Sequence, residues 1–184
     1  MKTRKFLTTT ILALAFGFTS FAQKTVMVGG AAMYPNKNII ENAVNSKDHT
    51  TLVAAVKAAD LVETLKGKGP FTVFAPTNAA FDKLPKGTVE SLLKPENKKK
   101  LQTILTYHVV AGKWSAADIA KAIKDGKGKA SIKTVSGGTL TAWMKGKDLY
   151  ISDENGNKSK VTIADVNQSN GVIHVVDAVL LPKS

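Results

Sequence analysis

The stretch from Phe71 to Leu84 constrains the fold of this chain more strongly than any other. Its first four residues, 71–74, are aromatic or β-branched, and such residues suit a half-buried β-strand. Pro76 should end that strand, because proline cannot donate a backbone hydrogen bond and moves the residue before it away from helical angles. Thr77 or Asn78 can then cap a helix by accepting a hydrogen bond from one of its first amides. The stretch therefore predicts a strand, a corner and a helix that packs back against a sheet.

The first 22 residues have the pattern of a secretory signal peptide. Basic residues precede an apolar run over 6–18, and a small-x-small site ends at Ala22. We predict cleavage after Ala22 and export of the mature chain to the periplasm or the medium. A membrane anchor is the alternative, but the run is shorter than the roughly 20 residues that a helical span requires. No later segment is apolar enough over that length, so the mature chain should not span a membrane.

The mature chain is strongly basic and contains no cysteine. Without cysteine it has no disulfide, thiolate nucleophile or cysteine-ligated metal site. The net charge is +12 for the whole chain and falls to +9 when the three basic residues of the signal are removed. Such a surface attracts anionic partners, for example acidic polysaccharide. Arg4 lies in the signal, and a mature chain without arginine is a poor candidate for specific nucleic-acid recognition.

Periodicity divides the rest of the chain into a helical first half and a β-rich second half. Apolar residues recur at helical spacing over 39–66, 97–106 and 115–123, whereas the period is two from about residue 130. We expect an extended lead-in over 23–35 and one domain over 36–184, because the sequence contains no internal repeat or linker. The order of elements predicts an α+β domain with mostly antiparallel strands.

Three motifs occur in order along the chain. They are residues 72–81, the pair Tyr107-His108, which we expect to begin a short strand, and residues 170–177. Together they resemble a fasciclin-type domain, also called FAS1, over roughly residues 36–182. The residues that carry the two long motifs are Thr72, Phe74, Ala75, Pro76, Thr77, Asn78, Phe81, Asn170, Gly171, Val172, Ile173, His174 and Asp177.

The resemblance implies a wedge-like β-sandwich of two sheets with helices packed around it, in which the two long motifs form neighbouring central strands. It also implies a secreted or surface module for cell adhesion or matrix binding, with no shared catalytic activity and no cofactor. In animal members, the Tyr-His pair and an Asp-Ile pair ahead of the last motif are linked to adhesion. The matching residues here are Tyr107, His108, Asp165 and Val166, with valine in place of isoleucine. We therefore predict these four as binding residues, and expect a monomer that binds a cell-surface protein or an anionic glycan.

The three histidines do not have the spacing of a metal site. None forms an i, i+4 helical pair or has another histidine nearby, so we predict no bound metal. His49 precedes a helix and should be exposed. His108 and His174 lie in apolar runs and should be structural residues of the core. Asp165 borders a loop, and it could be either a contact residue or a turn or cap acceptor.

An enzyme is the least favoured interpretation. The serines lack a nucleophile-elbow motif, and Asp177 lies three residues from His174, which in a strand turns the two side chains to opposite faces. The main alternative to an adhesion module is an envelope protein that binds anionic polysaccharide through lysine charge alone, and a hydrolase ranks third. Lysines 98–100 form either a solvated helix face or an anion site. Trp114 and Trp143 are either core residues or interface anchors.

Overall fold

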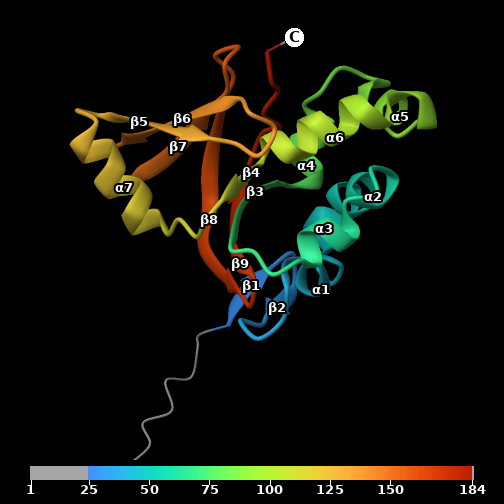
Figure 1. Ribbon diagram of the computed structural model, residues 1–184, viewed down its shortest axis with the longest axis horizontal. Helices are drawn as coiled ribbons and strands as arrows, with labels where there is room; N and C mark the ends of the chain where they lie inside the picture. The colour runs from blue at the N-terminus through green and yellow to red at the C-terminus, as the bar shows by residue number, and fades with distance from the viewer. Residues whose placement is uncertain (1–24, 184) are drawn as a thin grey trace, which may run out of the picture.

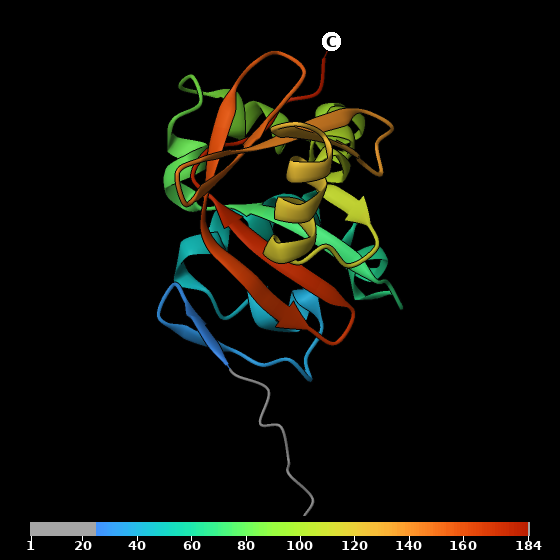
Figure 2. The same cartoon turned by 90° about the vertical axis from the view of Figure 1, so that its left-hand side faces the viewer.

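Residues 25–183, which the computed structural model describes, form one mixed sheet, a short hairpin and a set of surrounding helices (Figures 1 and 2). The strands are β1 (Val26–Val28), β2 (Ala31–Met33), β3 (Phe71–Pro76), β4 (Val109–Ala111), β5 (Lys129–Lys133), β6 (Thr139–Lys145), β7 (Asp148–Ser152), β8 (Lys158–Gln168) and β9 (Gly171–Val176). The helices are α1 (Ile39–Ala43), α2 (Thr50–Ala58), α3 (Val62–Lys66), α4 (Asn78–Asp82), α5 (Thr88–Leu92), α6 (Lys98–Tyr107) and α7 (Ala116–Asp125), with short 3-10 helices η1 (Lys47–His49) and η2 (Pro95–Asn97). The signal peptide predicted for residues 1–22 lies outside the described residues. No helix within the described range is both long and apolar enough to cross a membrane.

The corner predicted around Pro76 is confirmed. β3 ends at Pro76, and α4 begins two residues later with Thr77 as its N-cap. The Thr77 hydroxyl accepts a hydrogen bond from the Ala80 amide at 3.3 Å, which satisfies one of the first amides of the helix. Phe81 then packs into the core beside the strand that precedes the corner.

The two long motifs are neighbouring strands at the centre of the sheet, as the resemblance implied. The strand order is β4-β3-β9-β8-β7-β6-β5, and β3 and β9 run parallel with Phe74 opposite His174. The other strand pairs in this sheet are antiparallel. A parallel pair requires a long crossover connection, and every element from α4 to β8 lies between these two strands.

β8 joins the two halves of the sheet. It pairs with β7 near its start and with β9 further along, and its register with β9 shifts between Val161 and Ile163 and again between Ile163 and Val166. Irregularities of this kind bend a strand and increase its twist. The two expected sheets are therefore present as two halves of one hydrogen-bonded ladder that share β8, and the α+β fold class is confirmed.

Two hydrophobic cores lie on opposite sides of the central strands. Successive residues of a strand point to opposite faces, so Ala75 belongs to the core beneath α1–α6, while Phe74 belongs to the core between α7 and the β5–β7 half. Figure 1 shows α1–α6 on one side of β3 and β9, and α7 with β5–β7 on the other. The two motifs thus form a wall that both cores share.

The prediction that a strand begins at Tyr107-His108 is wrong. α6 runs through Tyr107, His108 is its C-cap, and β4 starts only at Val109. The His108 amide donates to the Leu105 carbonyl at 3.1 Å, which continues the helical turn. The helical conformation directs the Tyr107 ring into the core of the β5–β7 half, and this tertiary packing outweighs the β-propensity of the local sequence.

His49 is buried, contrary to the exposed position expected from the sequence, and only 3% of its surface is accessible. η1 turns the ring inward, where its Nδ1 lies 2.8 Å from the Ser46 hydroxyl. The lead-in over 23–35 contains the β1–β2 hairpin, whose Val28 and Met33 belong to the core beneath the helices. Gly29-Gly30 forms the turn of this hairpin with positive φ at both residues, whereas the burial of His49, Val28 and Met33 depends also on segments far away in the sequence.

Candidate functional site

His174 of β9 holds three segments together from inside the fold. Its ring is fully buried and stacks on Phe74 of β3, with ring centroids 5.7 Å apart. Nε2 donates to the Trp114 carbonyl at 2.8 Å, and Nδ1 accepts from the Asp165 amide at 3.3 Å. Burial lowers the pKa of His174, so the ring is neutral at physiological pH. Both nitrogens are therefore bound to main-chain groups, as expected of a structural histidine.

His108 has the same arrangement at the end of α6. Its Nδ1 donates to the Ile104 carbonyl at 2.8 Å, and its Nε2 accepts from the Leu180 amide at 3.0 Å. Burial lowers the pKa of His108 to about 4. The neutral ring thereby attaches the C-terminal segment to the helix, and its own carbonyl accepts from the Phe74 amide at 2.9 Å.

Tyr107 points into the other core and is fully buried. Its hydroxyl donates to the Thr139 carbonyl at 2.9 Å and accepts from the Glu154 amide at 3.2 Å. Burial raises the pKa of the Tyr107 hydroxyl to about 12. Gly138 lies so close that an added Cβ would come within 2.6 Å of the tyrosine ring. The Tyr-His pair therefore connects α6 to two different parts of the fold.

Asp165 occupies an irregular part of β8, with φ of 58°. Its Oδ1 accepts from the amide of Ala116, the first residue of α7, at 2.8 Å. A carboxylate there satisfies an otherwise unpaired amide and interacts favourably with the helix dipole. The cap-acceptor role that the sequence allowed is thus present, and the side chain still has partial contact with solvent.

The structure does not gather the four predicted binding residues on one surface. Tyr107, His108 and Val166 are buried, and Asp165 is the partly exposed member of the set. β9 and β3 lie between β8, which carries the Asp-Val pair, and β4, which follows the Tyr-His pair. A binding role for these residues remains a prediction, and it would have to act through the conformation of neighbouring segments.

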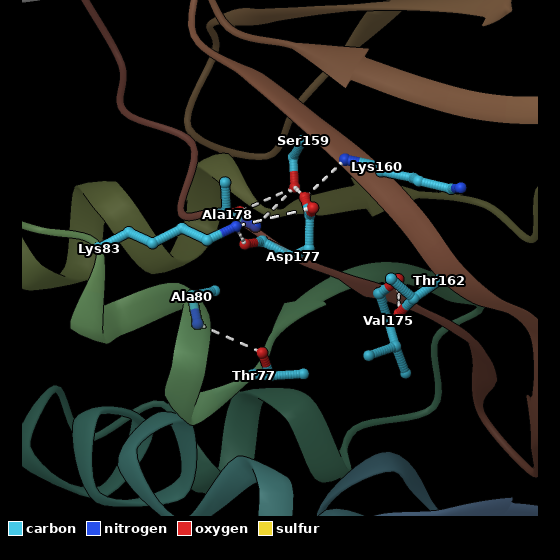
Figure 3. Close-up of polar contacts among 9 residues, drawn as sticks. All are labelled: Thr77, Ala80, Lys83, Ser159, Lys160, Thr162, Val175, Asp177 and Ala178. Carbon is cyan, nitrogen blue, oxygen red and sulfur yellow. Dashed lines mark hydrogen bonds and ion pairs between the residues drawn. The ribbon is translucent and has the colours of Figure 1, made fainter.

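Asp177 organises a polar cluster where β9 ends (Figure 3). Its Oδ1 accepts from the Lys160 amide at 2.7 Å, and its Oδ2 lies 3.6 Å from the Lys83 ammonium of the corner that follows β3. The Ser159 hydroxyl accepts from the Ala178 amide at 2.9 Å. The carboxylate therefore bonds to β8 and to the segment after α4, and it makes no hydrogen bond to a histidine of the described chain.

Asn170 fixes the start of β9. Its Oδ1 accepts from the Ile39 amide at 3.0 Å, and its Nδ2 donates to the carbonyls of Leu65 and Gly67 at 2.8 and 2.9 Å. An added Cβ at Gly171 would lie 2.0 Å from the Phe71 carbonyl oxygen, so only glycine fits there. The polar residues of this motif thus join β9 to α1 and α3.

An apolar cavity of about 80 Å³ lies between the helices and the β3–β9 wall. Apolar side chains make up most of its lining, with His49 and Ser46 among the polar exceptions. Nε2 of His49 is buried without a hydrogen-bond partner within residues 25–183. Burial lowers the pKa of His49, against smaller opposing effects of the Ala75 backbone and the Asp48 carboxylate. No sequence signal predicted this cavity, because its walls come from segments far apart in the chain.

A polar hollow of about 380 Å³ lies at the junction of α5 and α6. Lys86, Ser91, Asn97 and Lys100 contribute to its lining. Of the three lysines at 98–100, Lys98 forms an ion pair with Asp60, while Lys100 lines the hollow. Across residues 25–183, no three histidine, aspartate or glutamate side chains come together as a set of metal ligands.

Several known bacterial proteins are similar to this chain in sequence. The chain is 50% identical over 160 residues to Protein sll1483 of Synechocystis, which covers 87% of this chain and 82% of that protein. It is 35% identical over 166 residues to the cell surface glycolipoprotein MPB83 of Mycobacterium bovis, covering 88% of this chain and 68% of that protein. The immunogenic protein MPB70 of the same species is 36% identical over 145 residues, or 76% of this chain and 66% of that protein.

A solved FAS1 domain pair from the insect cell adhesion molecule Fasciclin I has the same fold, with a TM-score of 0.70 at 18% identity. The match covers 78% of this chain, which spans half the length of that structure. The sequence profile of the Fasciclin domain matches residues 47–182, which include all three motifs. The chain therefore belongs to the fasciclin domain family.

Proposed function

We propose that this protein is an exported, non-enzymatic binding module of the adhesion type, which acts in the periplasm or outside the cell. The proposal depends mainly on the hydrogen bonds that the motif side chains make with main-chain groups. Both ring nitrogens of His108 and His174 bond to backbone groups, and Asp177 bonds to an amide and a lysine. A general base needs a nitrogen or oxygen that can reach a substrate proton, and these groups are already committed.

The relatives support a surface location and an adhesive role. One is described as a cell surface glycolipoprotein, and the structural match comes from a cell adhesion molecule. The pattern of a signal peptide over residues 1–22 supports export. Members of the fasciclin family are adhesion-type modules, and a compact domain stabilised by its own cores suits that role.

The proposed partner is an anionic glycan or a glycan-coated protein on a cell surface. The predicted mature chain has 23 basic residues, all lysine, against 14 acidic ones. Among residues 25–183, four lysines form ion pairs with carboxylates. The remaining positive charge is available to attract an anionic surface.

Retention of the exported protein on envelope and medium fractions of the producing cells tests this proposal. We expect retention at low salt and a fraction that survives at high salt, because short-range contacts are not screened as exposed charges are. Absence of retention at both salt concentrations would overturn the proposal.

The lysine excess also favours a second candidate, an envelope protein that binds polysaccharide through charge alone. The same experiment separates the two functions. Retention that disappears completely at about 0.5 M salt, where the Debye length is only a few ångströms, would favour the charge-only protein.

A further inference from the structure

The outer face of strands β5–β8 combines aromatic rings, hydroxyls and lysines in ordered rows. Side chains alternate between the core and solvent along each strand, and the strand register aligns the solvent-facing ones. One row across the four strands is Lys129, Trp143, Tyr150 and Lys160. The next row is Ser131, Thr141, Ser152 and Lys158. These eight residues define what we call the outer face.

No helix of the described chain packs on the outer face. The main packing partners of β5, β6 and β7 are one another, β8 and α7. Ile119 and Ile123 of α7 belong to the same core as Leu140 and Ile151, so the helix covers the opposite, inward side of these strands. The outer face therefore presents its side chains to solvent.

Two stacked aromatic rings lie at the centre of the outer face. The rings of Trp143 and Tyr150 are 4.7 Å apart and nearly parallel at 15°. The ammonium of Lys158 lies 5.6 Å from the centre of the Trp143 ring, within the range of a cation–π contact. Half-buried tryptophan and tyrosine of this kind provide large, rigid contact area and are typical anchors of binding surfaces.

Positive charge surrounds this aromatic pair. Lys129 and Lys158 are exposed and form no ion pair among the described residues. Lys160 pairs with Asp148 at 2.8 Å, and Lys145 and Lys147 lie exposed at the nearby β6–β7 turn. The outer face therefore carries three lysines, and Lys145, Lys147 and Asp148 border it at the β6–β7 turn. This excess of positive charge is complementary to a polyanion with flat or apolar faces.

We propose that the outer face binds an anionic polysaccharide. The apolar C–H face of a sugar ring would contact Trp143 and Tyr150, its carboxylate or sulfate groups would pair with the lysines, and its hydroxyls would bond to Ser131, Thr141 and Ser152. Three strand spacings separate β5 from β8, roughly 14 Å, which accommodates a short run of sugars. A nucleic acid fits less well, because the predicted mature chain has no arginine and is predicted to be exported. The inference rests on the proposed function and assigns partner binding to the outer face.

Binding of a heparin octasaccharide to the exported protein, measured by calorimetry, tests the assignment. The variant Lys129→Gln/Lys158→Gln removes two charges from the outer face. Its matched control, Lys94→Gln/Lys99→Gln, removes two exposed lysines from the α5–α6 region. We expect the face variant to lose about tenfold in affinity and the control less than about twofold. Equal losses in both variants would overturn the assignment to this face.

A second variant tests the aromatic contact. Trp143→Thr should weaken binding about tenfold, and the loss should persist at about 0.5 M salt because stacking is not screened. Thermal unfolding confirms that each variant is folded. An unchanged affinity of folded Trp143→Thr would overturn the proposed stacking.

Two further outcomes separate this inference from the proposed function. If the wild-type protein is retained on envelope fractions but does not bind the octasaccharide, the inference fails and the proposed function stands. If it does neither, both fail. Tighter binding of a single-stranded DNA oligonucleotide, dependent on the same residues, would replace polysaccharide with nucleic acid as the occupant.

Discussion

The wall formed by β3 and β9 and the outer face of β5–β8 use similar residue types in opposite ways. In the wall, His174 and Phe74 are buried, and the polar atoms of His174 bond to main-chain groups. On the outer face, Trp143 and Tyr150 stack in partial contact with solvent, near Lys129 and Lys158, which form no ion pair within residues 25–183. The residues of the family motifs therefore hold the scaffold together, while the surface that we propose to bind a partner lies outside them.

This comparison predicts that substitutions in the wall chiefly reduce stability, whereas substitutions on the outer face chiefly reduce binding. The largest effect is expected at Phe74. Phe74→Ala removes a fully buried ring that contacts His174, and should lower the free energy of unfolding by about 3–5 kcal/mol. Urea denaturation measures this loss. A loss below about 1 kcal/mol would show that Phe74 is not a central core residue.

The second prediction concerns pH. The pKa of His108 is about 4 in the folded protein, below the ordinary value of 6.5 expected when the chain is unfolded. The neutral form is therefore favoured by folding. The stability that the neutral His108 ring contributes is therefore complete above about pH 6.5 and is lost as the pH falls towards about pH 4. Lowering the pH from about 7.5 to about 5 should remove roughly 2 kcal/mol of stability through His108.

His108→Gln is the matched variant, and urea midpoints at the two pH values provide the measurement. The variant should still lose some stability at acid pH, because burial also lowers the pKa of His49 and His174. Its loss should be clearly smaller than that of the wild type. Equal losses in the two proteins would contradict a role for His108 in the pH dependence.

Tyr107 and Tyr150 provide a direct test of the contrast between a buried side chain and one on the outer face. Tyr107→Phe deletes the bonds to Thr139 and Glu154 and should cost about 1–2 kcal/mol, because a partly buried amide and carbonyl lose their partner. Tyr150→Phe, on the outer face, should change stability by less than about 0.5 kcal/mol. Similar losses in the two variants would remove the distinction between the buried core and the outer face.

The sequence predicts the scaffold better than the surface for a physical reason. The corner at Pro76 and the capping by Thr77 depend on neighbouring residues, so local chemistry predicts them. The burial of His49 depends on distant segments. The alignment of Trp143 with Tyr150 depends on the register of β6 and β7, which the geometry of the turn between these strands determines. The sequence left Trp143 as either core or interface anchor, and only the register shows which other side chains lie beside it.

Asp165 is partly exposed but caps α7, and its replacement by asparagine should have little effect on stability. Asparagine can also accept from the Ala116 amide and tolerates the positive φ of this position, so Asp165→Asn should change stability by no more than about 0.5 kcal/mol. Alanine neither accepts this hydrogen bond nor tolerates positive φ well, so Asp165→Ala should lower the free energy of unfolding by about 1–2 kcal/mol. Retention on envelope fractions then distinguishes the two roles. If Asp165 only caps α7, Asp165→Asn is retained like the wild type, whereas a contact residue would lose retention with its charge while stability is unchanged.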